Sequence, residues 1–211
     1  AELRETHGVE VETISADLAV RDDVMRVADR IEDPARPIDW LINNAGFGLH
    51  STVLDRSEID IQARAFDVMC LAVLILGGAA GRAMRARGSG RIVNVASTSA
   101  AIYTGNYSAV KAWARTYSTA LQLELRGTGV TVTGLLPGWV RTEFHARGGK
   151  AKRSKVPGPL WLDPDQVARE ALRDAALGRV ISVPSWRYKF LAGVLKLLPG
   201  GLMRKISSVI S

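Results

Sequence analysis

Cysteine and histidine are scarce in this chain of 211 residues, which contains one cysteine and three histidines. The single cysteine, Cys70, excludes an intramolecular disulfide and fits a reducing compartment, so we expect a cytoplasmic protein. It lies in an apolar helical run, which favours a small core residue over a nucleophile. His7, His50 and His145 are far apart, with no carboxylate or thiol at ligand spacing, so we expect no metal site.

The chain also lacks a long apolar run. Its longest, Val68 to Ala80, is shorter than the ~20 residues that span a bilayer, and the first residues do not resemble a secretory signal. The net charge of +7 is shared between arginine-rich helices and two basic clusters, at residues 150–155 and in the C-terminal tail. Solvated charge accounts for this distribution, and we expect no nucleic-acid partner.

Length and composition predict one globular domain. Hydrophobic residues make up 47% of the chain and charged residues 23%, and 211 residues are enough to bury a sizeable core. We place the domain at residues 1–184 and treat residues 185–211 as a basic amphipathic tail.

The run GNYSAVKAWARTYSTALQLEL (residues 105–125) is the strongest functional signal. Apolar residues recur every three or four positions and proline is absent from Tyr107 to Arg126, which predicts an amphipathic helix. Tyr107 and Lys111 then lie one turn apart on one face. A nearby ammonium lowers the pKa of a phenol from ~10 toward working pH, so the pair could exchange a proton with a hydroxyl or ketone. The alternative is a tyrosine at the core edge beside a solvated lysine.

Two segments near this helix read as buried parallel strands. Gly90 to Ser97 is rich in valine and isoleucine and ends in a serine, at the end of the strand where open α/β sheets place their ligands. Val130 to Phe144 repeats the pattern and closes on Pro137 and Gly138. The strand Ile38–Asn43 likewise ends in the tetrapeptide NNAG.

These motifs together resemble one family. NNAG at residues 43–46, the strand ending in Ser97, YxxxK at Tyr107 and Lys111, and PGxVxT at residues 137–142 occur in the order found in short-chain dehydrogenases/reductases. The resemblance extends from the first residues to about Pro184. It implies an α/β fold, a Rossmann-like doubly wound parallel sheet, with NAD or NADP as the cofactor.

The resemblance also assigns roles to residues. Tyr107 would be the general acid/base, Lys111 would lower its pKa and hold the nicotinamide ribose, and Ser97 would polarise the substrate oxygen. Thr142 would bind the nicotinamide carboxamide. Asp17 would contact the adenine ring; it could also cap the helix that begins near Val20, and both can hold at once. The other cofactor-binding residues that the motifs imply are Asn43, Asn44, Ala45, Gly46, Pro137, Gly138 and Val140.

Two positions depart from the family's pattern. Met69 stands where the family has an asparagine that holds a water in the proton relay to the lysine, and a thioether is no donor and a poor acceptor. Catalysis would be weakened, or a backbone carbonyl would carry the relay. Ser97 also lies closer to Tyr107 than is usual, so Ser99 competes for its role. We favour Ser97 because it ends the strand.

The family's glycine-rich loop, TGxxxGxG, is absent from the chain. That loop holds the cofactor pyrophosphate against a helix N-terminus. The strands that accompany it complete the centre of the sheet, and without them apolar edges would be exposed. We therefore interpret the chain as incomplete at its N-terminus, lacking the first two strands and the first helix. The choice between NAD and NADP stays open.

The remaining patterns predict the other elements. Ala1 to His7 reads as the end of a helix stopped by Gly8, and Val9–Ser15 alternates as a strand. Further helices are expected at Arg21–Glu32, at residues 57–87, where Ser57 and Asp60 form a capping box or at least an acidic first turn, and from Pro164 to Leu177, capped by Asp163. Arg179–Pro184 would be the last strand.

An apolar pocket is expected where the loops after the strands meet. The residues that would line it are Ile102, Tyr103, Trp139, Phe144 and Trp161, under a mobile loop at residues 146–159. This favours a hydrophobic ketone or secondary alcohol as the substrate.

Two surfaces suggest partners. The family commonly builds dimers from the helix at residues 57–87 and the Tyr107 helix, so a homo-oligomer is expected. The tail places Trp186, Phe190, Val194 and Leu197 on one face and could lie on an anionic membrane. Packing against its own domain or a partner subunit is favoured over that peripheral membrane contact.

The leading hypothesis is an NAD(P)-dependent oxidoreductase that moves a hydride between nicotinamide and an apolar carbonyl or alcohol. The second is a non-catalytic protein that keeps the fold and binds a dinucleotide or a partner. A basic membrane-surface or nucleic-acid module rests on charge alone and is weakest.

Overall fold

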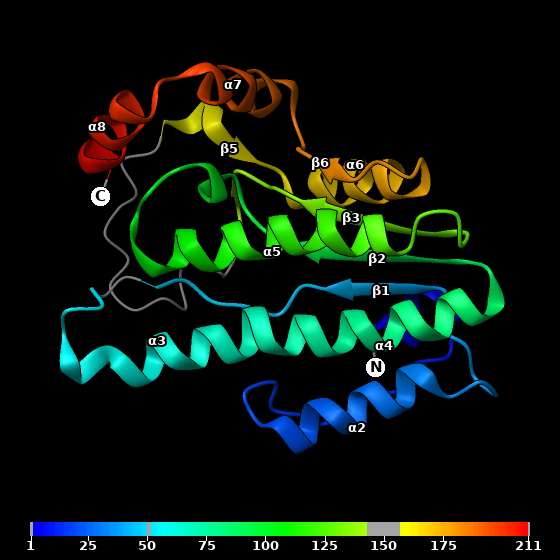
Figure 1. Ribbon diagram of the computed structural model, residues 1–211. Coiled ribbons are helices and arrows are strands. Elements are labelled where there is room, and N and C mark those ends of the chain that lie inside the picture. The colour runs from blue at the N-terminus through cyan, green and yellow to red at the C-terminus, as the bar shows by residue number, and fades with distance from the viewer. Residues whose placement is uncertain (1, 50–51, 143–156, 211) are drawn as a thin grey trace.

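The computed structural model describes residues 2–49, 52–142 and 157–210 as an α/β protein (Figure 1). Its longer helices are α1 (Glu2–His7), α2 (Arg21–Glu32), α3 (Ile59–Phe66), α4 (Ala72–Arg87), α5 (Gly105–Glu124), α6 (Pro164–Ala176), α7 (Trp186–Leu197) and α8 (Gly200–Ile210). The strands are β1 (Trp40–Asn43), β2 (Gly90–Val95), β3 (Val130–Leu135), β4 (Trp139–Val140), β5 (Trp161–Leu162) and β6 (Ile181–Ser182). A π-helical turn (Asp67–Leu71) joins α3 to α4, and short 3₁₀ helices lie at Arg56–Glu58, Thr98–Ala101 and Gly158–Leu160.

The main sheet is parallel, in the order β1-β2-β3-β6. Asn43 at the end of β1 pairs in register with Asn94 on β2, which in turn pairs with Gly134 on β3. The carboxyl ends of the three strands therefore meet at one edge, as predicted. The separate pair β4-β5 joins the segment after β3 to the segment before α6.

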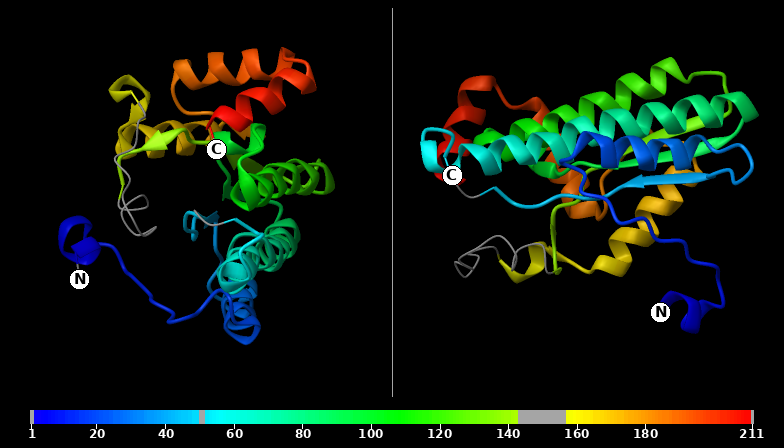
Figure 2. Two further views of the ribbon diagram at one scale, coloured as in Figure 1. Left: turned by 90° about the vertical axis from the view of Figure 1, so that its left-hand side faces the viewer. Right: turned by 90° about the horizontal axis from the view of Figure 1, so that it is seen from below.

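Helices cover both faces of the sheet, which confirms the predicted α/β layers (Figures 1 and 2). Alternate residues of each strand supply the two cores. Ile92 and Val132 pack with α2, α4 and α5 on one face, whereas Val93 packs with Ala171 and Ala175 of α6 on the other. These strands are buried on both faces, which is why they are apolar at consecutive positions.

The helix predicted at residues 57–87 is interrupted at its middle. In the π-helical turn, the amide of Ala72 donates to the carbonyl of Asp67, five residues back. Of the two predictions for its start, the capping box is wrong, because the chain enters through a 3₁₀ turn in which Asp55 accepts from the amide of Ser57 at 3.0 Å. The acidic first turn is confirmed, since Asp60 lies in the first turn of α3. Gly88 ends α4 in the left-handed conformation, at φ 77°.

The N-terminal segment differs most from prediction. Figure 2 shows α1 apart from the rest of the fold, at the end of an extended segment. The strand predicted at Val9–Ser15 is wrong for this structure, because no described strand pairs with it and its side chains are largely exposed. Glu12 instead forms ion pairs with Arg30 at 2.8 Å and Arg36 at 3.1 Å.

The C-terminal helices pack against the ends of the strands. Asp163 caps α6 by accepting from the amide of Gln166 at 3.0 Å, as predicted. Tyr188 of α7 is buried, and its hydroxyl donates to the carbonyl of Leu160 and accepts from the amide of Trp139. From α8, the Ser207 hydroxyl accepts from the amide of Tyr103 at 3.0 Å.

One helical stretch in the described residues, Arg56–Arg87, is long and apolar enough to cross a membrane by length and composition. More than half of its apolar window is buried inside the protein, where α2 and α5 pack against it. It is accounted for as the central core helix of this fold.

Candidate active site

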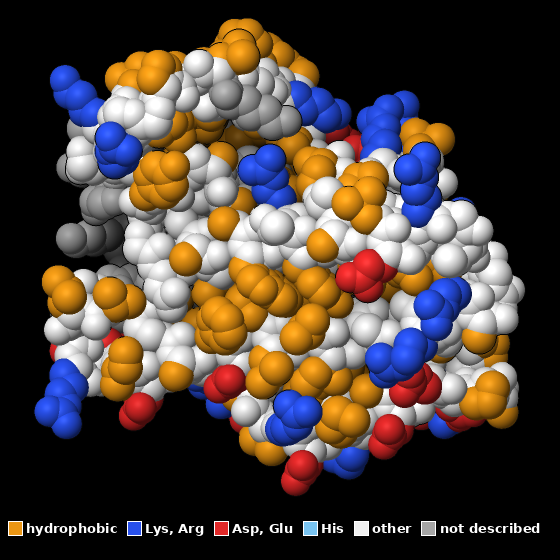
Figure 3. All heavy atoms as spheres, in the orientation of Figure 1, with side chains coloured by type: hydrophobic (Ala, Val, Ile, Leu, Met, Phe, Trp, Pro, Cys, Tyr) orange, Lys and Arg blue, Asp and Glu red, His pale blue; other side chains and the backbone are white. Residues whose placement is uncertain are grey.

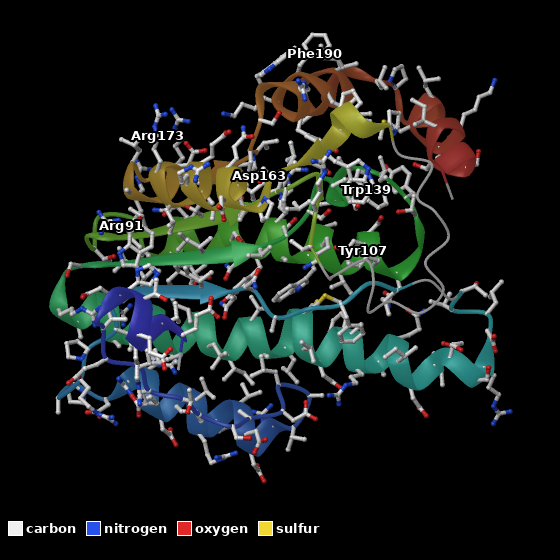
Figure 4. All side chains as sticks on the ribbon, turned by 180° about the vertical axis from the view of Figure 1, so that it is seen from behind. Arg91, Tyr107, Trp139, Asp163, Arg173 and Phe190 are labelled. Carbon is white, nitrogen blue, oxygen red and sulfur yellow. The ribbon has the colours of Figure 1, made fainter. Side chains whose placement is uncertain are left out.

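Ser97, Tyr107 and Lys111 meet at the carboxyl end of the sheet. Ser97 follows β2, while α5 carries Tyr107 and Lys111 one turn apart. A side-chain hydrogen bond joins Tyr107 to Ser97. The Lys111 ammonium donates to the carbonyl of Val95 at 2.9 Å and lies 5.7 Å from the centre of the Tyr107 ring. Figure 4 shows Tyr107 at the same end of the sheet as Trp139.

The start of α5 fixes where Tyr107 lies. Gly105 begins the helix at φ 74°, a conformation that favours glycine. The Ser108 hydroxyl bonds with that of Thr104 at 2.6 Å and so ties down the first turn. Asn106, beside Tyr107, donates to the buried Gln62 of α3 at 2.9 Å. Sequence reasoning missed Gln62 because a lone glutamine on a helix carries no pattern.

Burial governs the acidity of the pair. It raises the pKa of Tyr107 to about 12, against a smaller lowering by the hydrogen bond with Ser97. It lowers the pKa of Lys111 to about 8, and the nearby Cys70 thiol acts weakly in the opposite direction. Burial is the larger cause for both groups, and the lowering of the pKa of Tyr107 by Lys111 stays a prediction.

Ser97, rather than Ser99, faces the tyrosine. The hydroxyl of Ser97 bonds with Tyr107 and also accepts from the amide of Ser99 at 3.1 Å. Ser99 instead stabilises the 3₁₀ turn, where its carbonyl accepts from Ile102. This geometry supports the predicted choice between the two serines.

Gly46 packs against Met69 beside the lysine. A Cβ atom added at Gly46 would lie 2.9 Å from the Met69 sulfur and 3.7 Å from the Lys111 nitrogen. Met69 is almost fully buried within the π-helical turn. Asn44 and Ala45 are exposed on the same loop. The thioether thus occupies the side of Lys111 where the resemblance places a polar residue.

A polar chain crosses the sheet below this site. Asn43 donates to the side-chain oxygen of Asn94 at 2.8 Å, Asn94 donates to Ser118 at 3.0 Å, and Ser118 donates to the carbonyl of Ala114 at 2.7 Å. Asn94 and Ser118 are fully buried. The sequence pointed to Asn43 but missed the other two, because a buried serine on a helix resembles any small residue.

The segment after β3 carries the next predicted residues. The carbonyl of Pro137 accepts from both the amide and the hydroxyl of Thr98, which joins this loop to the one after Ser97. Gly138 lies beneath the Tyr188 ring, so closely that a Cβ atom would be 2.0 Å from it. Val140 is in β4 and half-buried, and Thr142 is exposed at the end of the described segment.

Asp17 lies apart from these residues. Its carboxylate accepts from the amide of Ala19 at 3.0 Å and from Arg64 of α3 at 2.9 Å. These two bonds, that of Ala19 first, hold its pKa below the usual value. The predicted cap is wrong: Val20 occupies the capping position of α2 and receives no side-chain bond, because Asp17 closes a turn before the helix.

The predicted pocket is partly described. The Trp139 and Trp161 rings lie 5.7 Å apart on β4 and β5, and Ile102 is half-buried. Tyr103 is mostly exposed rather than a packed wall, because only its backbone is held, by Ser207. Phe144 and residues 146–156 of the predicted loop lie outside the described residues.

Cys70 is a core residue, as predicted. It is buried in a cluster with Ala65, Val68 and Val110, and burial raises the pKa of its thiol to about 11. Among residues 2–49, 52–142 and 157–210, no three histidine, cysteine, aspartate or glutamate side chains lie close enough together to hold a metal ion.

The residues present fit the nicotinamide end of a dinucleotide. An ammonium has three donors, and among the described residues Val95 takes one of those of Lys111. The absence of a side chain at Gly46 leaves room for the Met69 side chain next to the lysine. Asn43, Asn44 and Ala45 border the same loop. The chain carries no TGxxxGxG loop for the pyrophosphate.

Comparison with known proteins places this geometry in a family. The model of the short chain dehydrogenase family matches residues 1–153, and the chain belongs to that family. Its members are NAD(P)-dependent oxidoreductases. Ketoacyl reductase HetN from Nostoc sp. is 38% identical over 117 residues, which are 54% of this chain and 40% of HetN. The chain thus spans less than half the length of that relative.

Solved structures support the same family assignment. A short-chain dehydrogenase from Sphingobium yanoikuyae in complex with NADPH is 30% identical with a TM-score of 0.79, covering 96% of this chain and 78% of that one. A bulky-bulky ketone specific alcohol dehydrogenase from Comamonas testosteroni is 26% identical with a TM-score of 0.74, covering 94% and 78%. These matches confirm the predicted Rossmann-like fold and the family's use of NAD(P).

Proposed function

We propose that this chain carries the catalytic residues of an NAD(P)-dependent oxidoreductase in which Tyr107 is the general acid/base. The observation that supports it most is the contact of Ser97 with Tyr107 at the strand ends, with the buried Lys111 ammonium on the same helix face. The bound nicotinamide would supply or accept the hydride. Ser97, Tyr107 and Lys111 would carry out the proton transfer and polarise the substrate oxygen.

In the reducing direction, Tyr107 acts as the acid. Its raised pKa keeps the phenol protonated at neutral pH, so it can donate a proton to a developing alkoxide. Ser97 donates a second hydrogen bond to the same oxygen and polarises it. Lys111 holds the nicotinamide ribose and places positive charge beside the phenolate that forms, which stabilises the transition state more than the ground state.

The relay that returns a proton to Tyr107 would use backbone rather than the Met69 side chain. Met69 offers no donor and only a weak acceptor. The π-helical turn pairs Ala72 with Asp67 instead of with the carbonyl four residues back, which alters the carbonyls of this segment, and π turns are frequent at functional sites. This supports the alternative in which a backbone carbonyl carries the relay.

The substrate would be a bulky apolar ketone or secondary alcohol. The described wall of the pocket is aromatic, formed by Trp139 and Trp161, and the solved relative from Comamonas testosteroni is named for bulky ketones. HetN is named as a ketoacyl reductase, which keeps a carbonyl as the reacting group.

The Tyr107→Phe variant of the whole protein tests the assignment. Turnover should fall by about 10²–10⁴-fold, because the proton donor is lost while the ring remains. Binding of NADPH, followed by its fluorescence, should stay within about twofold of wild type by the same reasoning. Tyr103→Phe is the matched control, since Tyr103 is exposed and keeps its backbone bond, and it should retain activity. Turnover by Tyr107→Phe at the wild-type rate would refute the role.

A non-catalytic dinucleotide-binding or interaction protein is the second candidate. The buried Met69 beside Lys111 favours it, because the thioether occupies a position that the relay would use. Tight NADPH binding without turnover on any ketone or alcohol would support this alternative. Met69→Asn would then be the informative variant: gained turnover would identify the relay as the missing part.

We also propose a homo-oligomer formed through α3, α4 and α5. Figure 3 shows apolar side chains gathered over α4 and α5 on this face. Phe66, Leu74 and Leu123 are about half exposed or more, and an open surface depression of about 430 Å³ lies beside Leu74 and Tyr117. Burying such a patch between copies is favourable. Leu74→Arg should lower the mass measured by light scattering to that of one chain.

A further inference from the structure

The outer face of α7 is apolar although the helix is packed. Trp186, Phe190 and Leu197 are 73%, 71% and 85% exposed and recur on one side of the helix. Figure 4 shows Phe190 pointing away from the body of the protein, and Figure 3 shows apolar side chains along this outer edge. Exposure of large aromatic side chains such as tryptophan and phenylalanine to water is unfavourable in free energy, and contiguous exposed apolar patches often mark binding sites.

Buried contacts on the opposite side of α7, and in α8, keep the apolar face of α7 turned toward solvent. Tyr188 is 4% exposed and its hydroxyl binds both Leu160 and the amide of Trp139. In α8, Met203 and Ser207 are buried, and Ser207 binds the backbone of Tyr103. The orientation of α7 is therefore fixed by buried contacts, and its apolar side has no such partner among the described residues.

The charged residues of α7 and α8 all have one sign. Five lysine and arginine residues and no aspartate or glutamate follow Ser185. Arg204 and Lys205 on α8 are exposed and form no ion pair with a described residue. Arg187 lies 5.8 Å from the Trp186 ring, so a guanidinium accompanies the apolar edge. Lys189 forms an ion pair with Glu170 of α6 at 3.7 Å.

We propose that α7 and α8 form a docking surface for an anionic lipid membrane. Trp and Phe on one side with lysine and arginine beside them are the composition of helices that lie in the lipid interface. A second copy fits less well, because a two-fold contact would place this basic surface against itself. The proposal does not depend on the reaction that the site performs.

Cosedimentation of the whole protein with vesicles tests the proposal. The protein should bind vesicles of phosphatidylcholine mixed with phosphatidylglycerol, bind at least tenfold less to pure phosphatidylcholine, and detach as salt screens the charges. Phe190→Glu should lower binding to the anionic vesicles at least tenfold. Leu177→Glu is the matched control, because Leu177 is 62% exposed directly after α6 and lies outside α7 and α8, and it should bind as wild type does.

A second variant separates charge from folding. Arg204→Glu combined with Lys205→Glu changes only exposed side chains and should also lower binding at least tenfold, with an unchanged circular dichroism spectrum. Wild-type protein that stays in the supernatant with anionic vesicles overturns the proposal. Equal binding by Phe190→Glu and wild type overturns it too. If the wild-type protein binds no vesicles and Phe190→Glu lowers the molecular mass measured in solution, the face contacts a second copy of the chain. That result overturns the membrane proposal as well.

Discussion

The carboxyl end of the sheet and the N-terminal segment are built in opposite ways. At the sheet edge, Ser97, Tyr107 and Lys111 are buried or half-buried and are held by hydrogen bonds within and between β2 and α5. Residues 8–17 form no strand, and their contacts with α2 and α3 are mainly exposed ion pairs such as Asp17 with Arg64. The first region is fixed by packing and the second by surface charge.

This difference predicts that the two regions contribute to different properties, the sheet edge to turnover and the N-terminal segment to cofactor affinity. Buried polar groups hold one geometry because an unsatisfied partner is costly, whereas exposed ion pairs contribute little and are screened by salt. Changes at the sheet edge should therefore alter both turnover and stability, and changes in the N-terminal segment should alter only cofactor affinity. The following variants test that distinction.

Lys111→Met should have the largest effect. Turnover should fall by about 10²–10⁴-fold, because the charge beside the phenolate is lost. The protein should nevertheless become more stable by about 1–2 kcal/mol at pH 7: the lowered pKa of Lys111 corresponds to about 3 kcal/mol for burying the ammonium, and the lost hydrogen bond offsets part of it. Urea unfolding and steady-state kinetics measure the two.

The stability gained by Lys111→Met should depend on pH. The pKa of Lys111 is lower in the folded protein, about 8, than the usual 10.5, so the folded state releases the proton first. Wild-type stability from this group therefore rises with pH between these values. The advantage of Lys111→Met should be full below about pH 8 and disappear toward pH 10.5. A gain that is the same at pH 7 and pH 10 would contradict this account.

Asn94→Leu should destabilise the protein by about 1–3 kcal/mol, because Asn43 and Ser118 lose their shared buried partner. Thr131→Val on the neighbouring strand is the matched control. The Thr131 hydroxyl is buried and has no hydrogen-bond partner in the described residues, so its removal should be neutral or stabilising. Thermal unfolding of both variants measures the loss of stability. A loss in Asn94→Leu alone would show that the hydrogen bonds of Asn43, Asn94 and Ser118 stabilise this edge of the sheet, rather than any polar side chain in a strand.

Asp17→Ala should have the smallest effect on stability. Both contacts of its carboxylate, with Ala19 and Arg64, are exposed or part-exposed, so the unfolding midpoint should not change measurably. If the adenine contact implied by the family resemblance holds, the KM for the cofactor should rise while kcat stays at the wild-type value. A lower kcat would show that this segment also orders the catalytic residues.

Local patterns predicted the catalytic part of the fold because each element there is specified by its own residues. Apolar strands at Gly90–Val95 and Val130–Leu135, and the long α5, formed as expected. The strand at Val9–Ser15 failed because alternation shows that a segment can pair, but not that a partner is present. The caps predicted at Asp17 and Ser57 failed for a related reason, since several acceptors precede each of those helices and only the path of the chain selects one, whereas the cap at Asp163 formed as predicted.

Contacts between elements limited prediction of the site. YxxxK and the strand ending in Ser97 could be recognised, since their spacing is local. The bonds from Asn94 to Ser118 and from Gln62 to Asn106 join residues 24 and 44 positions apart, and single amides or serines show no periodicity. The pKa of Tyr107 also depends on burial, which the neighbouring lysine in the sequence does not reveal.

The π-helical turn at Asp67–Leu71 sets the rotational phase of the long helix. An α-helix advances by about 100° per residue, so the wider turn rotates everything before it relative to everything after it. A chain shorter by one residue here would run as a continuous α-helix and swing Gln62 away from Asn106. The number of residues between α3 and α4, as much as their identity, therefore decides where the first turn of α5 is anchored.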